Sequence, residues 1–221
     1  MTDHYFSRIS MTHQGFERFV SSKYHGAYNL HKEIWKLFPD DPCGARNFLY
    51  AVVGDERTIY CVSTRVPVSN DGTWDVESKP YDPFIEEGDY FRFRVCVNPT
   101  VANDSTGKHQ RHDVVMDMKR RCKERGEDMP MEEIVHSAVM KWMERKGVSN
   151  GFEISDPDHA IVHSYLRNES MKGGVHKIVF STVVVEGILR VKEPELFRKV
   201  MFEGLWPAKG FGCGLMLVKR L

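Results

Sequence analysis

The sequence lacks the features that mark several common classes of protein. Lys and Arg together number 31, and Asp and Glu also number 31, so the net charge points to neither an acidic nor a basic partner. No apolar run approaches the roughly 18 residues that a membrane helix needs, and the first residues do not resemble a secretion signal. We therefore expect a cytoplasmic protein with no membrane partner.

Cysteine and histidine patterns typical of metal sites are also lacking. The five cysteines include no Cys-x-x-Cys pair and are odd in number, which argues against a disulfide framework and against a structural zinc site. His109 and His112, like His159 and His163, have helical spacing, but no carboxylates accompany them in a known metal-binding arrangement. We expect no metal and no cofactor.

Positive charge is concentrated within this neutral chain. Residues 92–125 contain nine Lys and Arg against four Asp and Glu, whereas residues 71–89 contain seven acidic residues and one lysine. Segregated charge steers a polyanion to one face of a protein, although a solvated surface is the commoner explanation of a single charge run. The basic residues of this part of the chain that we take as candidate contacts to a polyanion are Arg92, Arg94, Arg111 and Arg120.

Residues 204–214 combine four glycines with a lysine and precede an apolar run. Glycine lets a backbone approach another molecule closely, which suits a phosphodiester chain better than an apolar ligand. The segment is not a Walker loop, because Gly210 follows Lys209 where that motif has Ser or Thr. It is not a dinucleotide fingerprint either, since that needs a preceding strand and a following helix. Lys209, Gly210 and Gly212 are candidate contacts to phosphate, and a glycine-rich turn before a strand is the alternative.

Residue periodicity predicts a repeated order of strands and helices. For the first half we expect a strand at 5–10, a helix at 28–38, strands at 47–53, 58–66 and 89–98, and a turn-rich acidic segment at 67–88. For the second half we expect strands at 114–118, 159–165, 178–191 and 212–218, helices at 131–146 and 194–202, and a connecting tip at 167–174.

This order is β-α-β-β-α-β, the ferredoxin-like pattern, with the second helix of the first copy missing or degenerate. We therefore expect an α+β protein made of two tandem ferredoxin-like domains. The first domain would span residues 1–98, residues 99–112 would be a linker, and the second domain would span residues 113–221.

The helix expected at 28–38 places a tyrosine and a histidine together at the edge of its buried face. At 100° per residue, four apolar side chains form one stripe: Leu30, Ile34, Leu37 and Phe38. Tyr28 and His31 lie beside this stripe, three residues apart and within reach of one another, half shielded from water. An ordinary helix border is the common explanation of such a pair when nothing else gives it a task.

If the pair is catalytic, RNA suits it as a substrate, because RNA carries its own nucleophile. A deprotonated 2′-hydroxyl attacks the adjacent phosphate and the 5′-oxygen leaves, with no need for a metal. His31, with a reference pKa of about 6.5, serves as acid or base at neutral pH, whereas Tyr28, with a pKa of about 10, is a weaker base but a good donor. Lys36, Lys209 or an arginine would supply the positive charge.

Four sequence blocks resemble the CasE family, the CRISPR repeat-RNA endoribonucleases of type I, subtype E systems. The blocks are YNLHKEIWKLFP at 28–39, PV at 67–68, YFRFRVCVNP at 90–99 and GLWPAKGFGCGL at 204–215, in the order of the family. The resemblance spans the whole chain. It implies the tandem ferredoxin-like fold and metal-independent cleavage of a CRISPR precursor RNA at the base of each repeat stem-loop, which leaves a 2′,3′-cyclic phosphate or its opened form. It also implies that the protein retains the product hairpin as a subunit of the Cascade complex.

The resemblance assigns roles to particular residues. The catalytic histidine and tyrosine of the family fall on His31 and Tyr28, and a lysine found in some members falls on Lys36. The glycine-rich loop of the family falls on residues 204–214, with Lys209 retained. A basic hairpin that grips the RNA stem falls on residues 167–177. The candidate RNA contacts in this hairpin are Arg167, Lys172 and Lys177.

Two alternatives stay open at this point. A non-catalytic RNA-binding subunit of a CRISPR ribonucleoprotein complex would share the fold and the basic residues, but it would lose nothing when His31 is changed. A metal-dependent nuclease is disfavoured, because we expect no cluster of carboxylates at a strand end or on a helix face. Either Tyr28 or His31 could accept the first proton. The acidic stretch 71–89 is a candidate surface for docking on other subunits, because it should repel RNA.

Overall fold

The computed structural model describes residues 4–21, 27–39, 46–54, 57–103, 110–163, 165–172, 176–205 and 207–221. The chain divides into two compact units made of non-contiguous segments. Unit 1 comprises Met1–Phe84, Glu169–Ile178 and Val200–Met216, and unit 2 comprises Ile85–Asn168, Val179–Lys199 and Leu217–Leu221. These limits differ from the continuous division expected from the sequence (1–98, 99–112 and 113–221), which stays a prediction.

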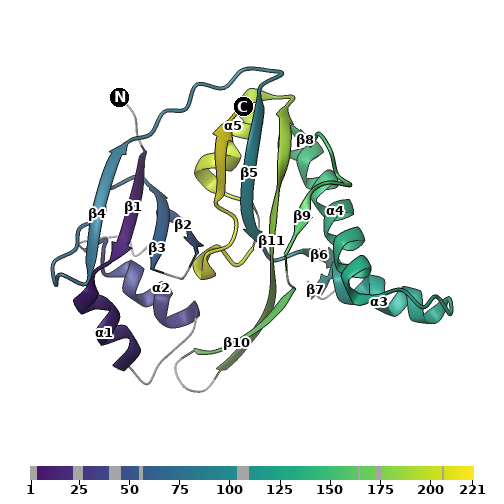
Figure 1. Cartoon of the computed structure of the whole chain (residues 1–221), viewed down its shortest axis with the longest axis horizontal. Helices are drawn as coiled ribbons and strands as arrows, with labels where there is room; N and C mark the ends of the chain where they lie inside the picture. Colours follow the sequence, from purple (N-terminus) through teal and green to yellow (C-terminus); the bar gives the residue numbers. More distant parts are fainter. Residues whose placement is uncertain are drawn as a thin grey trace. The chain divides into compact units, whose positions relative to one another are not determined.

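Unit 1 contains a four-stranded sheet with the strand order β2-β3-β1-β4 (Figure 1). The strands are β1 (Tyr5–Met11), β2 (Phe48–Val53), β3 (Thr58–Ser63) and β4 (Trp74–Pro80). In the antiparallel register of the three strands β3, β1 and β4, Ile9 lies opposite both Ile59 and Val76. Ile9 and Ile59 are fully buried, so this row of side chains forms the centre of the sheet's covered face.

Two helices, α1 (His13–Ser21) and α2 (Ala27–Trp35), connect β1 to β2. The helix expected at 28–38 ends earlier, at Trp35, so Leu30 and Ile34 of the expected apolar stripe lie on α2, whereas Leu37 and Phe38 follow it in a turn. All four side chains are buried, as expected. They join Ile9 and other side chains of the sheet in one hydrophobic cluster. Burial of this stripe fixes the direction in which the remaining side chains of α2 point.

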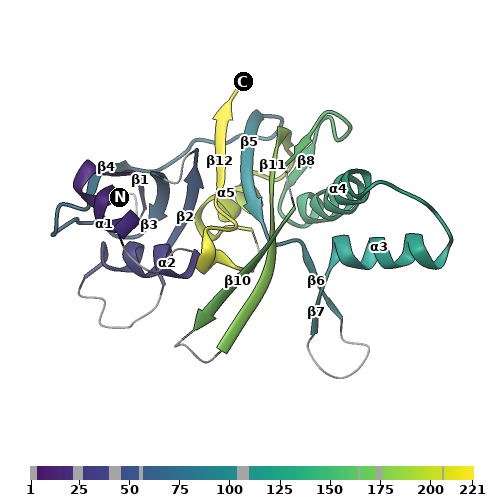
Figure 2. The same ribbon diagram turned by 60° about the horizontal axis from the view of Figure 1, so that its bottom comes forward.

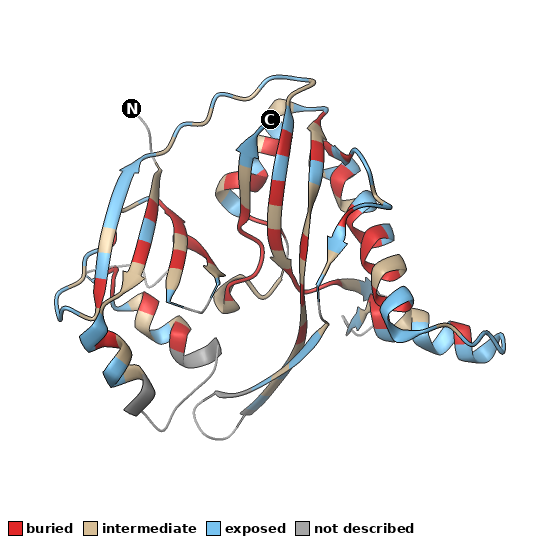
Figure 3. Ribbon diagram, viewed as in Figure 1, coloured by how far each residue is buried: buried red, intermediate tan, exposed pale blue. Residues whose placement is uncertain are grey.

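A six-stranded sheet lies mainly in unit 2, with β10, β11, β5 and β12 in that order, while β8 and β9 also pair with β11. The strands are β5 (Tyr90–Val97), β8 (Phe152–Ile154), β9 (Ile161–Val162), β10 (Leu166–Lys172), β11 (His176–Val191) and β12 (Met216–Arg220). The period-two pattern of β5 is confirmed, with Phe91, Phe93, Val95 and Val97 buried (Figure 3).

Three helices accompany this sheet: α3 (Val114–Glu124), α4 (Met131–Ser149) and α5 (Pro194–Glu203). Phe197 of α5 packs against Phe91 and Phe152, with ring centroids 5.9 and 5.8 Å apart. Trp142 and Met143 of α4 are also buried. Large aromatic side chains therefore fill the space between the helices and the sheet.

The two sheets repeat one strand order. In unit 1 the strands follow the chain as β1, β2, β3 and β4 and lie side by side as second, third, first and fourth. In unit 2, the four strands β5, β8, β11 and β12 follow one another along the chain. They lie side by side as β8, β11, β5 and β12, which is again second, third, first and fourth. Helices follow the first strand in both units. In unit 2 α5 follows the third strand, whereas residues 64–73, all of them described, form no helix after the third strand of unit 1. The expected tandem ferredoxin-like α+β fold, with one helix missing from the first copy, is thereby confirmed.

The strand expected at 89–98 forms, but it was assigned to the wrong sheet. Its observed counterpart, β5, pairs with β11, and the fourth strand of the first sheet is β4. The sequence of β4, WDVESKP, has only Trp74 fully buried among exposed and half-buried side chains. A strand at the edge of a sheet needs little apolar sequence, so the turn-rich composition of this region concealed it.

The strand expected at 114–118 is wrong, since these residues begin α3. Asp113 caps the helix, and its carboxylate accepts hydrogen bonds from the backbone nitrogens of Val115 (2.9 Å) and Met116 (3.1 Å). The β-branched pair at the start of α3 resembled a strand, but the aspartate before it is a helix-start signal. Helix α1 was missed for a similar reason. Thr12 Oγ1 accepts from the backbone nitrogen of Gly15 at 3.0 Å and starts that helix.

Two further expectations about connecting segments need correction. The segment expected as a linker contains a hairpin of β6 (Thr100–Asn103) and β7 (Gln110–Asp113), which Figure 2 shows beside the start of α3. Residues 167–174 were expected to be a connecting tip, but Leu166–Lys172 forms the strand β10. Polar and charged residues on both segments gave no period-two signal, although backbone pairing in a hairpin does not require one.

Candidate active site

The glycine-rich segment, residues 204–214, forms a tight loop of unit 1 that leads into β12. Gly204, Gly212 and Gly214 have φ angles of 72°, 79° and 92°, which side chains other than glycine rarely tolerate. The backbone nitrogen of Leu205 donates to the carbonyl of Gly214 at 2.8 Å and closes the loop. A Cβ added at Gly214 would lie 2.5 Å from the carbonyl oxygen of Leu205, so this closure requires glycine.

Between these ends the loop contains the short 3-10 helix η1 (Lys209–Phe211). Tyr50 of β2, which is 1% exposed, donates its hydroxyl hydrogen to the carbonyl oxygen of Gly210 at 2.9 Å. A Cβ added at Gly212 would lie 3.1 Å from the ring of Tyr50. The buried phenol of Tyr50 therefore holds the loop against the sheet, and its ring leaves little room for a side chain at position 212.

His31 of α2 lies beside this loop. A Cβ built on Gly210 would lie 3.4 Å from Cε1 and 3.7 Å from Nδ1 of His31, and 3.3 Å from Nη1 of Arg46. The missing side chain of Gly210 thus leaves room for an imidazole and a guanidinium to converge on the backbone of the loop. His31 therefore lies beside the loop that carries Lys209, one of the residues expected to supply positive charge.

The two nitrogens of the His31 ring have different surroundings. Trp35, one helical turn further along α2, donates its indole N–H to Nε2 at 2.9 Å. Nδ1 is buried and has no hydrogen-bond partner among the described residues. A buried polar atom without a partner costs about 1–3 kcal/mol, so Nδ1 is ready to bond to a ligand.

Burial and positive charge both affect the ionisable groups of this site. Burial lowers the pKa of His31, and the positive charge of Arg46 lowers it further. Burial also lowers the pKa of Lys209, to which Arg46 adds a smaller effect in the same direction. Arg46 itself has a lowered pKa because the surrounding protein displaces water from its guanidinium. These groups therefore favour their neutral forms more than they would in water.

Lys209 is held by the chain segment that precedes the loop. Its Nζ donates to the carbonyl oxygen of Glu203, the last residue of α5. A lysine at this position satisfies a carbonyl that the helix leaves without a partner and complements the negative end of the helix dipole. Lys209 therefore caps α5, whether or not it also contacts phosphate.

Tyr28 and Lys36 are the other two residues expected to be catalytic. Tyr28 belongs to α2 by its backbone, but its side chain is outside the described part of the structure. Lys36 follows the helix, and its Nζ forms an ion pair with Glu33 at 2.7 Å. Lys36 lines a cavity of about 310 Å³ together with Arg18, Lys32 and residues of the β3–β4 connection, and His31 is not part of that lining.

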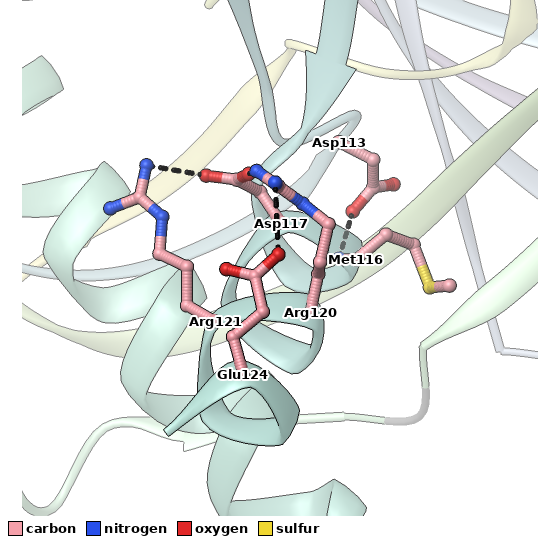
Figure 4. A network of polar contacts seen from close by, with 6 residues as sticks. All are labelled: Asp113, Met116, Asp117, Arg120, Arg121 and Glu124. Atoms are coloured by element: carbon pink, nitrogen blue, oxygen red, sulfur yellow. Dashed lines mark hydrogen bonds and ion pairs between the residues drawn. The ribbon is translucent and has the colours of Figure 1, made fainter. Parts of the chain in front are cut away.

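Basic residues expected to contact RNA in unit 2 differ in their partners. Arg92 and Arg111 are exposed, whereas Arg94 pairs with Glu186. Arg120 pairs with Asp117 at 2.5 Å and with Glu124 at 3.3 Å, and Figure 4 shows this network on α3. Arg121 also pairs with Asp117, at 2.7 Å. Pairs at this spacing are typical of a solvated helix surface.

The basic residues of the β10–β11 hairpin are only partly described. Arg167 is exposed, and Lys177 pairs with Glu169 across the two strands at 2.7 Å. The side chain of Lys172 lies outside the described residues, although its backbone belongs to β10. The expected hairpin therefore exists, and the contacts of its basic residues with RNA stay a prediction.

The described residues contain no group of three or more His, Cys, Asp or Glu placed to hold a metal ion. In the same part of the chain, no helix is both long enough and apolar enough to cross a membrane.

Sequence reasoning did not identify three residues of this site: Arg46, Tyr50 and Trp35. Trp35 had a detectable signal, since it stands four residues after His31 on a helix and therefore on the same face. Arg46 and Tyr50 are separated from the loop by more than 150 residues, and only the folded chain brings them together.

The fold and this site together define a tandem ferredoxin-like protein with an imidazole facing a glycine-rich loop. A family model described as CRISPR associated protein matches residues 4–220. The chain belongs to this family of CRISPR-associated proteins, and the resemblance to CasE noted in the sequence is confirmed. The Cascade subunit CasE of Escherichia coli (strain K12) is 25% identical over 202 residues, which cover 88% of this chain and 92% of that protein.

Solved structures show the same fold. Thermus thermophilus Cse3 bound to an RNA representing a pre-cleavage complex matches with a TM-score of 0.72 at 19% identity, and the match covers 98% of both chains. The CRISPR-associated protein Cas6e from Escherichia coli K-12 matches with a TM-score of 0.61 at 23% identity, covering 98% of this chain and 100% of that chain.

Proposed function

We propose that this protein is a metal-independent endoribonuclease that cleaves CRISPR precursor RNA at the base of the repeat stem-loop. The observation that carries the proposal is the half-buried ring of His31, whose unpartnered Nδ1 faces the backbone of Gly210 beside Arg46. The related proteins act in this class of system, as a CRISPR Cascade subunit and as an RNA-bound Cse3.

The reaction uses the nucleophile of the substrate. The 2′-oxygen loses its proton and forms a bond to the adjacent phosphorus, the bond from phosphorus to the 5′-oxygen breaks, and the 5′-oxygen gains a proton. The products are a 2′,3′-cyclic phosphate and a free 5′-hydroxyl. The enzyme must align the attack and stabilise the charge on the phosphorane.

The residues of the site suit these tasks. His31 and Tyr28 are the groups that we assign to proton transfer and to hydrogen bonding of the reacting oxygens, which contributes about 10²–10⁴-fold. Arg46 and Lys209 would stabilise the negative charge of the phosphorane. The backbone of Gly210 and Gly212 gives the phosphate close access to these groups. Lys36, which is paired with Glu33, would act from outside this cluster.

We further propose that the protein keeps the cleaved stem-loop and joins other Cascade subunits in the cytoplasm. Because side chains do not read the deep major groove of A-form RNA easily, stem shape and phosphate contacts should dominate recognition. Arg92, Arg94, Arg111, Arg120 and the β10–β11 hairpin are candidates for these contacts. Affinity should fall steeply with salt, since each phosphate contact releases condensed ions.

One experiment tests the reaction. Purified protein is incubated with the repeat RNA of its CRISPR array in excess EDTA, together with an RNA that carries a 2′-deoxy sugar at the scissile nucleotide. We expect cleavage of the natural RNA, no cleavage of the deoxy RNA and no cleavage by His31→Ala. His13→Ala is the matched control, because His13 is an exposed histidine of α1 paired only with Glu17 among the described residues.

The outcomes separate the alternatives. Cleavage of the deoxy RNA would falsify attack by the 2′-hydroxyl. Loss of cleavage in EDTA would support a metal-dependent nuclease. Tight binding without any cleavage would support a non-catalytic RNA-binding subunit, and equal rates for His31→Ala and His13→Ala would remove His31 from the mechanism.

A further inference from the structure

We propose that Trp35 is a positioning residue that fixes the tautomer of His31, so that the hydrogen of the neutral ring is on Nδ1 and points toward the glycine-rich loop. The role of this hydrogen in cleavage rests on the proposed function. The tautomer itself is a property of the free protein.

The indole of Trp35 determines which nitrogen of the His31 ring is unprotonated. An indole N–H is a donor and has no acceptor capacity, so its partner must be an unprotonated nitrogen. At 2.9 Å, the distance between Trp35 Nε1 and His31 Nε2 is that of a normal hydrogen bond. Nε2 therefore accepts, and the single hydrogen of a neutral imidazole is on the other nitrogen, Nδ1.

The indole is itself held in place. Its ring contacts the ring of Phe48 edge-on with centroids 5.2 Å apart, and it meets the ring of His31 at an interplanar angle of 86°. Because α2 also buries Ile34 next to it, Trp35 has a fixed position relative to His31. A donor with a fixed position selects one ring orientation and one tautomer, as second-shell groups do for other functional histidines.

Protonation of the ring would oppose this contact. An imidazolium carries hydrogens on both nitrogens, so Nε2–H would face the indole N–H and the bond would be lost. Two groups from other elements lie near the ring: Arg46 before β2, whose positive charge also opposes protonation, and Phe211 of η1, whose ring centroid is 6.3 Å away and which carries no charge. The ring is therefore kept neutral, with one donor hydrogen available at Nδ1.

This arrangement restricts what His31 does in the resting enzyme. Nδ1–H donates a hydrogen bond to a phosphate or leaving-group oxygen beside Gly210. To accept a proton at Nδ1, the ring would first have to move its hydrogen to Nε2 and break the bond with Trp35. The inference thus places His31 on the side of the phosphoryl and 5′-oxygens rather than beside the 2′-hydroxyl.

Nuclear magnetic resonance of ¹⁵N-histidine-labelled protein tests the inference without RNA. The two-bond proton–nitrogen correlations of His31, identified by their loss in His31→Ala, should show the Nδ1–H tautomer above pH 7. In Trp35→Phe the pattern should change to a mixture of tautomers, and the pKa of His31 should rise. Replacing Trp35 by a benzothiophene-bearing alanine, which retains the ring size and lacks only the N–H, should give the same change if Phe disturbs the fold.

Trp142→Phe is the matched control, because it also removes an indole N–H bond, to the carbonyl oxygen of Thr100 at 3.0 Å, in unit 2. The His31 pattern should be unaltered in this variant. An Nε2–H tautomer in the native protein, or an Nδ1–H pattern unchanged in both Trp35 variants, overturns the inference.

Cleavage assays then connect the tautomer to the reaction. Trp35→Phe should lower the single-turnover rate about 3- to 10-fold with little change in RNA affinity, and it should move the acid limb of the pH–rate profile to higher pH. A protein with the expected tautomer that does not cleave RNA would contradict the proposed function and leave the Trp35 assignment in place. A changed tautomer with an unchanged rate and profile would overturn the assignment of His31 to the phosphoryl side.

Discussion

Two groups of positive charge in this protein differ in how they are stabilised. On α3, Arg120 and Arg121 are each within 2.7 Å of Asp117, so opposite charges attract. Around Gly210, the positive charge of Arg46 lowers the pKa of both His31 and Lys209, so like charges repel. On the exposed helix, the carboxylate of Asp117 already neutralises the arginine charge, so no ligand is needed there. Repelling groups that converge on an open backbone are stabilised when an anion binds between them.

Removing one arginine from each group should give the largest difference in activity between them. Arg46→Ala should lower the single-turnover cleavage rate by about 10²-fold, because one preorganised donor to a charged transition state is lost. Arg120→Ala should change the rate by less than about twofold, since an exposed ion pair contributes little. Both rates are measured with saturating protein, so that binding does not limit them.

If the two variants lose equal activity, the distinction between the groups is wrong. A large loss for Arg120→Ala alone would instead place the catalytic or RNA-aligning charge on α3, and Arg46 would have only a structural role in the loop.

A smaller effect is expected from filling the space at Gly210. A Cβ there would lie 3.3 Å from Arg46 and 3.4 Å from His31, so both side chains would have to shift by a few tenths of an ångström. Gly210→Ala should therefore lower the cleavage rate by about tenfold, as small displacements of catalytic groups do. Gly187→Ala is the control, because a Cβ there would be similarly crowded, 3.2 Å from the ring of Phe93, but would not contact His31 or Arg46. An unaltered rate in Gly210→Ala would show that the ring and the guanidinium do not need this space.

How far the sequence predicted these regions depends on the range of the interactions. The burial of Leu30, Ile34, Leu37 and Phe38, the alternation of β5 and the helix α4 follow from local periodicity, and all three are confirmed. β4 was missed and β5 was assigned to the wrong sheet, because pairing between strands depends on contacts that no local pattern records.

Long-range contacts also explain which residues of the site were not predicted. His31 and Lys209 were identified from motifs, and the structure places His31 beside the loop that carries Lys209. The hydroxyl of Tyr50 bonds to Gly210 across 160 positions of the chain, and Arg46 reaches the same glycine from the segment before β2. No spacing rule relates such residues, so only the fold could reveal that positive charges converge there.

The pH dependence of stability tests whether burial and Arg46 lower the pKa of His31 in the group around Gly210. The pKa of His31 is lowered in the folded protein, so below about pH 6.5 the unfolded chain binds a proton that the folded chain resists. Stability should therefore increase as pH rises through the interval between the lowered pKa and about 6.5. Urea denaturation at several pH values should show this rise in the native protein, a weaker rise in His31→Ala, and a narrower interval in Arg46→Ala. An identical pH dependence in His31→Ala would mean that burial does not perturb this ring.

The smallest expected effect comes from the backbone of the loop rather than from its charges. Ala208, just before η1, has a φ of 64° and is the only residue other than glycine with a positive φ in the described part of the chain. A left-handed conformation costs an L-residue about 1–2 kcal/mol, and glycine lacks this cost but loses more entropy on folding. Ala208→Gly should thus raise the free energy of unfolding by about 0.5–1 kcal/mol, measured as a higher urea midpoint at unchanged slope. Ala208→Val should lower it, because a branched side chain resists this conformation more strongly. If glycine instead destabilises the protein, the strain is offset by contacts of the Ala208 methyl group, and the loop is positioned by packing rather than held against its own backbone preference.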